Sequence, residues 1–260
     1  TCTFIESAKE EAIATILQMA EFKKIGKCRA LIVAGCLGQR YKKEILDELP
    51  EVDAIVGTGA WDRIMEAVNA SLAGNKIIIA DKSEIIYNDS MPRILTTPKY
   101  TAYVKVAEGC DNQCAYCVIP LVRGKFRSRP IESIVAETKE LVKQGAREIN
   151  LIAQDTTNYG IDIYGEIKIV DLLKELVKID ELKWIRLLYC YPKRFTDELL
   201  EFMASEPKIC KYIDLPLQHA HNDILKSMAR QDTKEEIEEL LGKIRKIMPQ
   251  ASIRTSFIVG

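Results

Sequence analysis

Residues 108–117 read Glu-Gly-Cys-Asp-Asn-Gln-Cys-Ala-Tyr-Cys, the most informative stretch of the chain. Cys110, Cys114 and Cys117 follow one another at C-x3-C-x2-C spacing. Thiolates bind iron–sulfur clusters, and four ligands are the usual number. Three close ligands leave one iron without a protein partner, and that iron can hold a small molecule. The spacing therefore predicts a [4Fe-4S] cluster that supports chemistry rather than one that only carries electrons.

Two other interpretations of these cysteines remain open at this point, a zinc loop and three unrelated thiols. Zinc also prefers tetrahedral sulfur sites, but its usual pattern is a pair of C-x2–4-C knuckles with a complete ligand set. Three cysteines in eight residues, with no second knuckle beside them, fit a cluster better than they fit zinc.

The composition is that of an ordinary soluble globular protein. The 260 residues are 47% hydrophobic and 29% charged, enough for about two domains. No apolar run approaches the roughly 18 residues that span a bilayer, so no membrane partner is expected. Eight cysteines without an extracellular cue favour reduced thiols in the cytoplasm, used for metal. A net charge of −1 gives no electrostatic attraction to nucleic acid.

Residues 1–95 predict a first domain, an α/β unit with a Rossmann-like parallel sheet. Alternating strands and helices imply a parallel sheet covered by helices. The expected helices are 6–22, 41–49 and 61–72, and the expected strands are 29–35 and 54–56. A connector over 76–101, with a boundary near 92–99, follows. The chain starts in the middle of a pattern, so we expect a first strand before Thr1.

Residues 96–260 predict a partial (βα) barrel of the TIM type. The expected strands are 102–107, 148–153, 184–188, 212–215 and 253–259, and the expected helices are 131–144, 169–179, 196–203 and 222–247 with a break near Asp232. Strand–helix repeats of this length are typical of such barrels. A last strand and its helix are expected beyond residue 260, which suggests a fragment.

A second pair of cysteines, Cys2 and Cys36, falls where strands of the first domain would end. In open α/β sheets this carboxyl edge is where ligands bind. Two ligands are too few for a cluster, so a third would come from the strand before Thr1. The alternative is a pair of buried thiols, since free cysteine is among the most buried residue types.

The chain resembles the methylthiotransferase branch of the radical S-adenosylmethionine (SAM) enzymes, and within it the RimO-type ribosomal-protein methylthiotransferases. The matching stretches are TCTFIESAKEEA (1–12), AGCLGQRY (34–41), LPEVDAIVGTG (49–59), KYTAYVKVAEGCDNQCAYCVIP (99–120), RGKFRSRPIESIVAE (123–137), INLIAQDTTNYG (149–160) and YIDLPLQHAHNDILKSMAR (212–230). The resemblance implies SAM and two [4Fe-4S] clusters, one per domain, with Cys2 and Cys36 as ligands of the second. It also implies a C-terminal TRAM domain, which could contact nucleic acid.

The alternative within this branch is the MiaB type, which methylthiolates an isopentenylated adenosine in transfer RNA. Both types share the cysteine motif and the RSRPIE-like stretch. FIESAKEE at 4–11, and DLPLQHAH at 214–221 in place of a PVQSGS-like stretch, resemble the RimO type.

The resemblance implies the following chemistry. One electron from a reducing partner cleaves SAM, and the resulting radical takes hydrogen from the β-carbon of an aspartate in the small-subunit ribosomal protein twelve. The second cluster supplies sulfur, which another SAM methylates. The protein orients the cofactors and excludes water.

Four polar residues are candidate SAM or substrate contacts, each with a structural alternative. Tyr116, between two predicted ligands, could flank the adenine or simply pack. Gln154 and Asp155 end a predicted barrel strand on the side where barrel enzymes bind substrate, or they cap the next helix. Gln218 occupies a similar position.

The remaining candidates are left open by the sequence. His219 and His221 could be acid–base groups or ligands, but polar loop residues are favoured because thiolates already provide the ligands. Arg123, Lys125, Arg127 and Arg129 could contact an anion or form a solvated loop. Cys28, Cys190 and Cys210 fit no ligand pattern.

Overall fold

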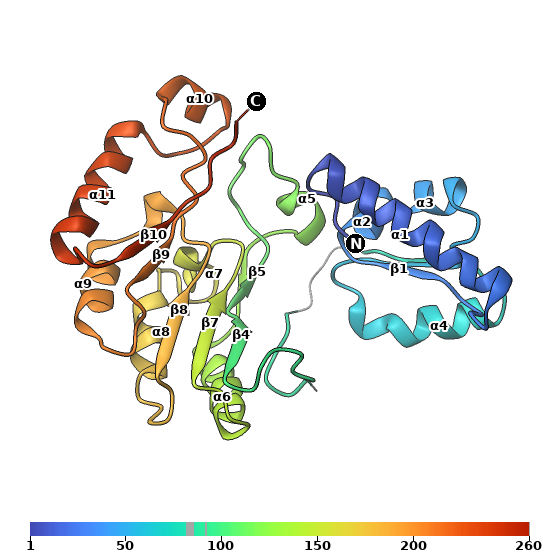
Figure 1. The fold of residues 1–260 in the computed structure, drawn as a ribbon, viewed down its shortest axis with the longest axis horizontal. Helices are drawn as coiled ribbons and strands as arrows, with labels where there is room; N and C mark the ends of the chain where they lie inside the picture. Colours follow the sequence, from blue (N-terminus) through green and yellow to red (C-terminus); the bar gives the residue numbers. More distant parts are fainter. Residues whose placement is uncertain (82–85, 92, 260) are drawn as a thin grey trace. The chain divides into compact units, whose positions relative to one another are not determined.

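The computed structural model describes residues 1–81, 86–91 and 93–259, in two compact units (Figure 1). Unit 1 comprises Thr1–Ile85 and Cys117–Lys125, and unit 2 comprises Ile86–Tyr116 and Phe126–Gly260. Pro92, in the predicted boundary region, lies outside the described residues. The boundary at 95/96 stays a prediction.

Unit 1 is a parallel three-stranded sheet with helices on both faces. Its strands are β1 (Ile32–Ala34), β2 (Ala54–Val56) and β3 (Ile77–Ile79), in the order β1-β2-β3. Its helices are α1 (Glu6–Ile25), α2 (Cys36–Tyr41), α3 (Lys43–Glu48), the 3-10 turn Trp61–Arg63, α4 (Ile64–Leu72) and α5 (Ile119–Arg123). The β2 residues are at most 1% exposed, because apolar clusters from α1–α3 on one face and α4 on the other cover them (Figure 1).

Two elements of unit 1 differ from the sequence expectation. Ile77–Ile79 was expected in a connector but forms β3, because three β-branched residues pair well with the buried strand β2. Residues 36–41 form the short helix α2, which begins directly after Gly35. Gly35 has φ of +106°, and a Cβ there would lie 3.3 Å from the Thr1 backbone, so glycine is required.

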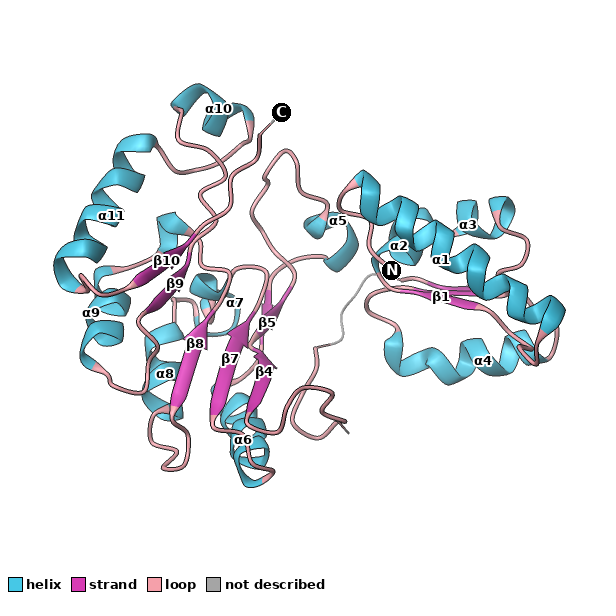
Figure 2. Cartoon of the chain, viewed as in Figure 1, coloured by secondary structure: helices cyan, strands magenta, loops and turns pink. Residues whose placement is uncertain are grey.

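Unit 2 contains a succession of parallel strands joined by helices, which confirms the predicted α/β fold (Figure 2). Strands β4 (Thr101–Lys105), β7 (Glu148–Ile152) and β8 (Trp184–Leu187) form one sheet, and β9 (Tyr212–Asp214) pairs with β10 (Ser252–Arg254). A parallel bridge from Ile185 to Ile209 and a bond from Cys190 N to Asp214 O link the β8 and β9 segments. The main helices are α6 (Ile131–Lys143), α8 (Ile169–Leu176), α9 (Asp197–Ser205) and α11 (Lys234–Ile247).

The expected break near Asp232 separates α10 (Asn222–Ser227) from α11. Helix α11 begins with a capping box in which Thr233 and Glu236 satisfy each other's backbone N–H groups. The turn before it places Ala229 at φ +52°, a left-handed conformation that is uncommon for residues other than glycine.

An antiparallel ribbon that the sequence did not predict closes the cysteine loop at its base. β5 (Ala107–Glu108) pairs with β6 (Arg127–Ser128), so residues 109–126 form one long loop that connects the two strands. Tyr159 and Asp162, near the short helix α7 (Ile161–Tyr164), support this ribbon, since Tyr159 Oη donates to Arg129 O at 2.6 Å and Ser128 N donates to Asp162 Oδ2 at 2.8 Å.

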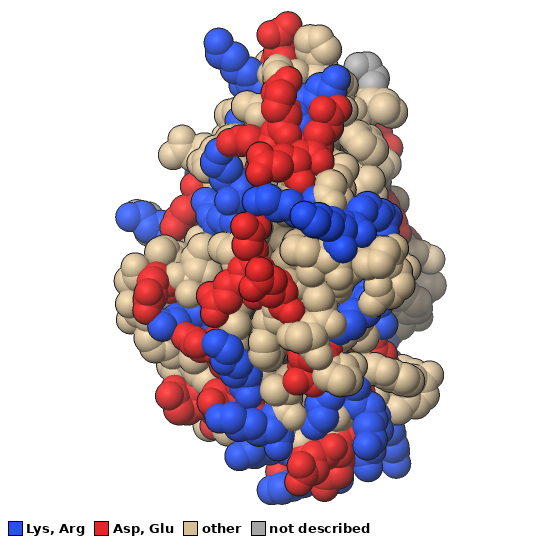
Figure 3. Space-filling view, turned by 90° about the vertical axis from the view of Figure 1, so that its left-hand side faces the viewer, with Lys and Arg blue, Asp and Glu red and all other residues tan. Residues whose placement is uncertain are grey.

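Charged residues of both signs alternate over the face that Figure 3 shows, in keeping with a net charge of −1. Within residues 1–81, 86–91 and 93–259, no helix has the length and apolar character needed to cross a membrane.

The last arginine of the predicted basic loop is part of the core. The Arg129 side chain is 1% exposed and lies 2.5 Å from a carboxylate oxygen of Glu137, whose side chain is 7% exposed. It also donates to Lys105 O at 2.8 Å and to Ser133 Oγ at 3.0 Å. Arg129 therefore fastens α6 to the end of β4, and it does not belong to a solvated loop.

We expect Arg129→Met to lower the free energy of unfolding by about 1.5–3 kcal/mol, because the buried Glu137 carboxylate then keeps only the Arg93 guanidinium as its charged partner and the bonds of Arg129 to Lys105 O and Ser133 are lost. Urea denaturation of the protein followed by circular dichroism measures this change. Lys143→Met is the matched control. Lys143 lies on α6, as Glu137 does, but it is exposed beside Glu140, so its replacement should leave the urea midpoint unchanged. Equal effects of the two substitutions would contradict this role.

Candidate metal centre

The cysteine loop, residues 109–126, leaves the carboxyl end of the β4–β5 segment, where parallel sheets and barrels place their sites. Gly109 opens the loop at φ +81°, and its N–H donates to Gln154 Oε1 at 2.6 Å. Further along, Ala115 N donates to Met228 O at 2.9 Å. A contact to the loop after β7 and another to the C-terminal end of α10 (Asn222–Ser227) therefore hold the backbone on both sides of the first two cysteines.

The structure places the predicted ligands as follows. Cys110 is buried and Cys114 is half-buried, both in unit 2, and Cys117 begins the segment 117–125 of unit 1. Across the part of the chain that the structure describes, no three Cys, His, Asp or Glu side chains are gathered as metal ligands. The cluster assignment therefore stays a prediction that rests on the donor set, three thiols on one loop, which is the chemistry that iron–sulfur clusters require.

A buried carboxylate fixes the loop between these cysteines. Asp155, 1% exposed, accepts from Asn112 Nδ2 at 2.9 Å, from an Arg194 guanidinium nitrogen at 2.8 Å and from Thr157 Oγ1 at 2.8 Å. The same Arg194 nitrogen donates to Asn112 Oδ1 at 2.8 Å. Asn112 is 7% exposed, so the network is shielded from water.

Gln154 and Asp155 both take part in holding this loop. Both were expected to contact SAM or substrate, or to cap a helix. Asp155 does precede the 3-10 turn Thr156–Asn158, but its side chain makes no capping bond there. In the structure, the two side chains bind Gly109 and Asn112 of the cysteine loop, and their contact with SAM or substrate stays a prediction.

Three residues that the sequence reasoning missed, Tyr191, Arg194 and Arg230, form a cluster next to the loop. The guanidinium groups of Arg194 and Arg230 lie over the ring of Tyr191, at 5.1 Å and 4.0 Å from its centroid. Arg194 reaches Asn112, and Arg230 lies 4.0 Å from the sulfur of Cys114. Tyr191 and Arg194 follow β8 as Gln154 and Asp155 follow β7, so their place after a barrel strand is the signal that could have found them.

Tyr116 lies beside this cluster of side chains. Burial raises the pKa of its phenol, and the neighbouring Cys114 sulfur raises it further. The hydroxyl group therefore stays protonated at neutral pH and is a hydrogen-bond donor near Cys114.

Gln218 and the two histidines lie in the loop after β9. Gln218 has φ of +70°, and its backbone bridges to residues 256–258 through bonds to Ser256 O and from Ile258 N, both 2.9 Å. His219 Nδ1 accepts from His221 N at 3.0 Å, and His221 Nδ1 accepts from Asp223 N at the start of α10. The histidines therefore organise a turn, as polar loop residues do.

Cys2 and Cys36 lie on segments that run beside each other in unit 1. The amino group and hydroxyl of Thr1 donate to Ala34 O at 3.2 and 2.9 Å, and Arg40 donates to Thr3 O at 3.1 Å. Thr1, before Cys2, is thus in contact with Ala34, two residues before Cys36. Cys2 is exposed, and Cys36 is half-buried at the start of α2.

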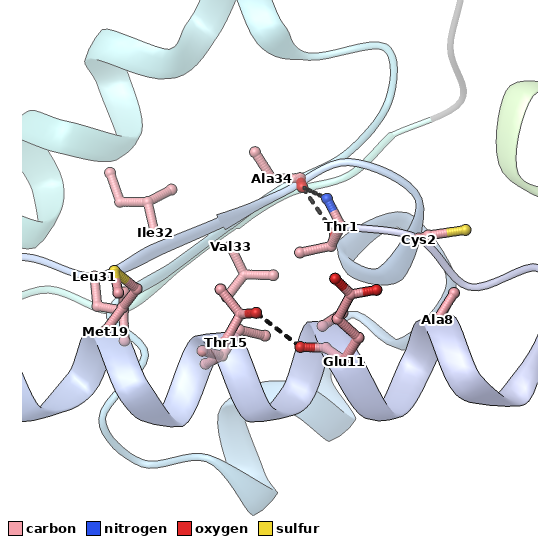
Figure 4. A pocket seen from close by; sticks show the side chains of 12 residues that line it. Thr1, Cys2, Ala8, Glu11, Thr15, Met19, Leu31, Ile32, Val33 and Ala34 are labelled. Carbon is pink, nitrogen blue, oxygen red and sulfur yellow. Dashed lines mark hydrogen bonds between the residues drawn. The ribbon is translucent and has the colours of Figure 1, made fainter.

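A hollow of about 420 Å³ lies next to Cys2, between α1 and β1 (Figure 4). Its lining includes Glu11 and Thr15 of α1 and Val33 of β1. The Cys2 sulfur points away from the Glu11 and Thr15 side chains (Figure 4). The cysteine is thus at the rim of the hollow, with its sulfur directed elsewhere.

A second arginine–cysteine pair occurs in unit 1. A guanidinium nitrogen of Arg123, at the end of α5, lies 3.9 Å from Cys36 Sγ. Helix α5 is held in unit 1 by the Thr58 hydroxyl, which donates to Val122 O. Arg123 therefore belongs to the surroundings of a predicted ligand.

The remaining cysteines, Cys28, Cys190 and Cys210, fit no ligand pattern in the sequence. Cys190 is 3% exposed, and burial raises the pKa of its thiol, so it is inert. Burial also raises the pKa of Cys210, and Cys28 Sγ donates to Ala30 O at 3.3 Å.

Comparison with protein families gives two matches that divide the chain. The radical SAM superfamily matches residues 104–260, and the uncharacterized protein family UPF0004 matches residues 1–57. A ribosomal protein uS12 methylthiotransferase RimO from Desulforamulus reducens is 59% identical over the whole chain, which covers 59% of that protein. One of the same name from Heliobacterium modesticaldum is 54% identical, and the chain covers 56% of it. The chain thus spans little more than half the length of these relatives.

Solved structures with the same fold share little sequence. The radical SAM methyltransferase TsrM from Kitasatospora setae, solved with tryptophan and a SAM analog, has a TM-score of 0.67 at 14% identity, covering 95% of this chain and 52% of its own. The cobalamin-dependent SAM radical enzyme OxsB has a TM-score of 0.63 at 11% identity, covering 99% of this chain and 40% of its own. These likenesses support the fold alone.

A double-mutant cycle tests the loop network. We expect Asn112→Ala and Asp155→Ala each to destabilise unit 2, and the double variant to lose less than the sum, with a coupling energy of about 0.5–3 kcal/mol. Urea denaturation of the four proteins measures it. Asn150→Ala is the control partner for Asp155→Ala. The Asn150 amide on β7 contacts Thr101 on β4, away from Asp155, so the changes in the free energy of unfolding should be additive for these two substitutions. An additive Asn112–Asp155 cycle would contradict the network.

Proposed function

Because the chain belongs to the radical SAM superfamily, we propose that the full-length protein is a RimO-type methylthiotransferase. Its substrate would be an aspartate of ribosomal protein uS12, the small-subunit protein twelve, modified by a methylthio group at the β-carbon. The observation that carries the proposal is the C-x3-C-x2-C loop at the carboxyl edge of unit 2, within a chain 59% identical over its whole length to a uS12 methylthiotransferase.

In this proposal Cys110, Cys114 and Cys117 would hold one [4Fe-4S] cluster, and Cys2 and Cys36 would hold a second with a further ligand. When bound, the first cluster and SAM would supply a 5′-deoxyadenosyl radical, using one electron from a low-potential donor. The donor set of the loop fits this role, because three thiolates leave one iron for SAM.

The chain's own polar residues would divide the remaining work. Gln154 and Asp155 would hold the cysteine loop in place through Gly109 and Asn112, which are their partners in the structure. Tyr116 would contact SAM from the same loop. Gln218, in the loop after β9, would contact SAM or the substrate.

The partners follow from the same proposal. They are uS12 within the ribosome and a cytoplasmic electron donor. Nucleic-acid contact would come from a TRAM domain outside residues 1–260. The transfer-RNA alternative is not favoured, because relatives at 48–59% identity over the whole chain are named for uS12.

We expect Cys114→Ala to remove one cluster and all SAM cleavage, because only two protein ligands remain on the first cluster. Cys36→Ala should spare the first cluster and SAM cleavage while abolishing sulfur insertion. Iron and sulfide analysis, with chromatography of 5′-deoxyadenosine from the anaerobically reconstituted full-length protein, measures both. Cys190→Ala is the matched control, a buried cysteine expected to change neither activity. Equal loss of both activities in Cys36→Ala would contradict two separate roles.

The substrate assignment is tested by mass spectrometry of uS12 and transfer RNA, each incubated with full-length protein, SAM and reductant. We expect a methylthio mass gain on one aspartate of uS12 and none on adenosine. A gain on adenosine alone would move the protein to the transfer-RNA enzymes. SAM cleavage with neither product would refute both substrates.

A further inference from the structure

Arg230 brings a buried positive charge to the sulfur of a predicted cluster ligand. Its side chain is 4% exposed, and one guanidinium nitrogen lies 4.0 Å from Cys114 Sγ. The other terminal nitrogen donates to Pro216 O at 3.3 Å and lies 3.0 Å from Asp232. The guanidinium plane also lies over the Tyr191 ring, 4.0 Å from its centroid. Four different contacts thus fix the group beside Cys114.

Stability alone does not account for this arrangement. Both partners of the Arg230–Asp232 pair are nearly inaccessible to water, and a buried pair is often no more stable than apolar side chains of the same size. Within the described residues, Arg230 Nε has no hydrogen-bond partner, and neither Asp232 oxygen makes a well-aligned bond. Ala229, the preceding residue, is held in a left-handed conformation. The fold thus keeps the buried charge of Arg230 next to a predicted cluster ligand, although this charge does not add to the stability of the fold.

We propose that Arg230 is a positioning residue that donates an N–H to the Cys114 sulfur and raises the reduction potential of the cluster bound there. This inference rests on the proposed function, because it takes Cys110, Cys114 and Cys117 as the ligands. Hydrogen bonds to cluster sulfurs and the net charge around a cluster are the main influences on its potential. A cluster on three thiolates is anionic, and accepting one electron adds a further negative charge. A fixed guanidinium therefore favours the reduced state.

Asp232 opposes this effect, because its carboxylate lies on the same guanidinium and burial keeps its field unscreened. Removal of the guanidinium and removal of the carboxylate should therefore shift the reduction potential in opposite directions. Arg230→Met should shift it to more negative values, and Asp232→Asn should shift it to more positive values. A residue that only stabilised the fold would not produce shifts of opposite sign.

The experiment measures the midpoint potential of the cluster by redox titration followed by electron paramagnetic resonance. It uses the anaerobically reconstituted full-length protein without SAM, with Cys2→Ala and Cys36→Ala so that one cluster contributes. We expect Arg230→Met to lower the ratio of reduced to oxidised cluster at a fixed potential about tenfold, which corresponds to about 59 mV for one electron. Arg230→Lys, which keeps the charge but not the planar fork, should shift less.

Arg186→Met is the matched control. Arg186 also lies over a tyrosine ring, that of Tyr212 at 4.8 Å, and also pairs with a carboxylate, that of Glu148 at 2.9 Å. It sits on β8, before the carboxyl edge where the cysteine loop emerges. Its replacement should leave the potential unchanged.

The outcomes separate this inference from the proposed function. A wild-type protein that binds no cluster would overturn both. A wild-type protein that binds the cluster and cleaves SAM, with the same potential in Arg230→Met, would overturn only the role of Arg230. An unchanged potential with weaker SAM binding would also overturn it, because Arg230 would then act on the cofactor. If Arg230→Met does not fold, Arg230→Lys and Asp232→Asn decide through the sign of their shifts.

Discussion

The buried carboxylate of Asp155 is the contact on which the geometry of the cysteine loop depends. A loop of 18 residues between β5 and β6 has few backbone partners of its own, so its shape must come from side chains outside it. Asp155 supplies this by accepting from Asn112 inside the loop and from Arg194 outside it. Because the carboxylate has lost its water, each of these bonds counts for more than it would at the surface.

The same carboxylate makes it possible to place two guanidinium groups over one ring. Arg194 and Arg230 both lie over Tyr191, and two like charges this close would repel each other in a medium of low dielectric constant. Each has its own acidic partner, Asp155 for Arg194 and Asp232 for Arg230. Two ion pairs and an aromatic ring thus form one connected cluster of side chains next to Asn112 and Cys114.

Much of this arrangement follows from the sequence, but not all of it. The alternation of strands and helices and the place of the cysteine loop after a strand could be predicted, because hydrophobic period and strand direction are local properties. The role of Asp155 could not, since the strand pattern places it at a carboxyl edge but does not say whether it faces a cofactor or another loop. The ribbon of Ala107–Glu108 with Arg127–Ser128 was missed for a related reason. Two residues carry no periodicity, and their pairing partners lie 21 and 19 residues further along the chain, Ser128 for Ala107 and Arg127 for Glu108.

The basic residues after the cysteines show why charge type alone did not settle their role. Arg129 is buried against Glu137, whereas Arg123 reaches the sulfur of Cys36 at 3.9 Å. In unit 2, a guanidinium nitrogen of Arg230 lies 4.0 Å from the sulfur of Cys114. Arginine suits this task better than lysine, because its planar group has several donors in fixed directions. One N–H can point at a sulfur while others bind a carbonyl, as Arg230 binds Pro216 O. A lysine ammonium would have to give up one contact to make the other. The geometry thus favours arginine wherever a thiolate and the backbone need the same cation.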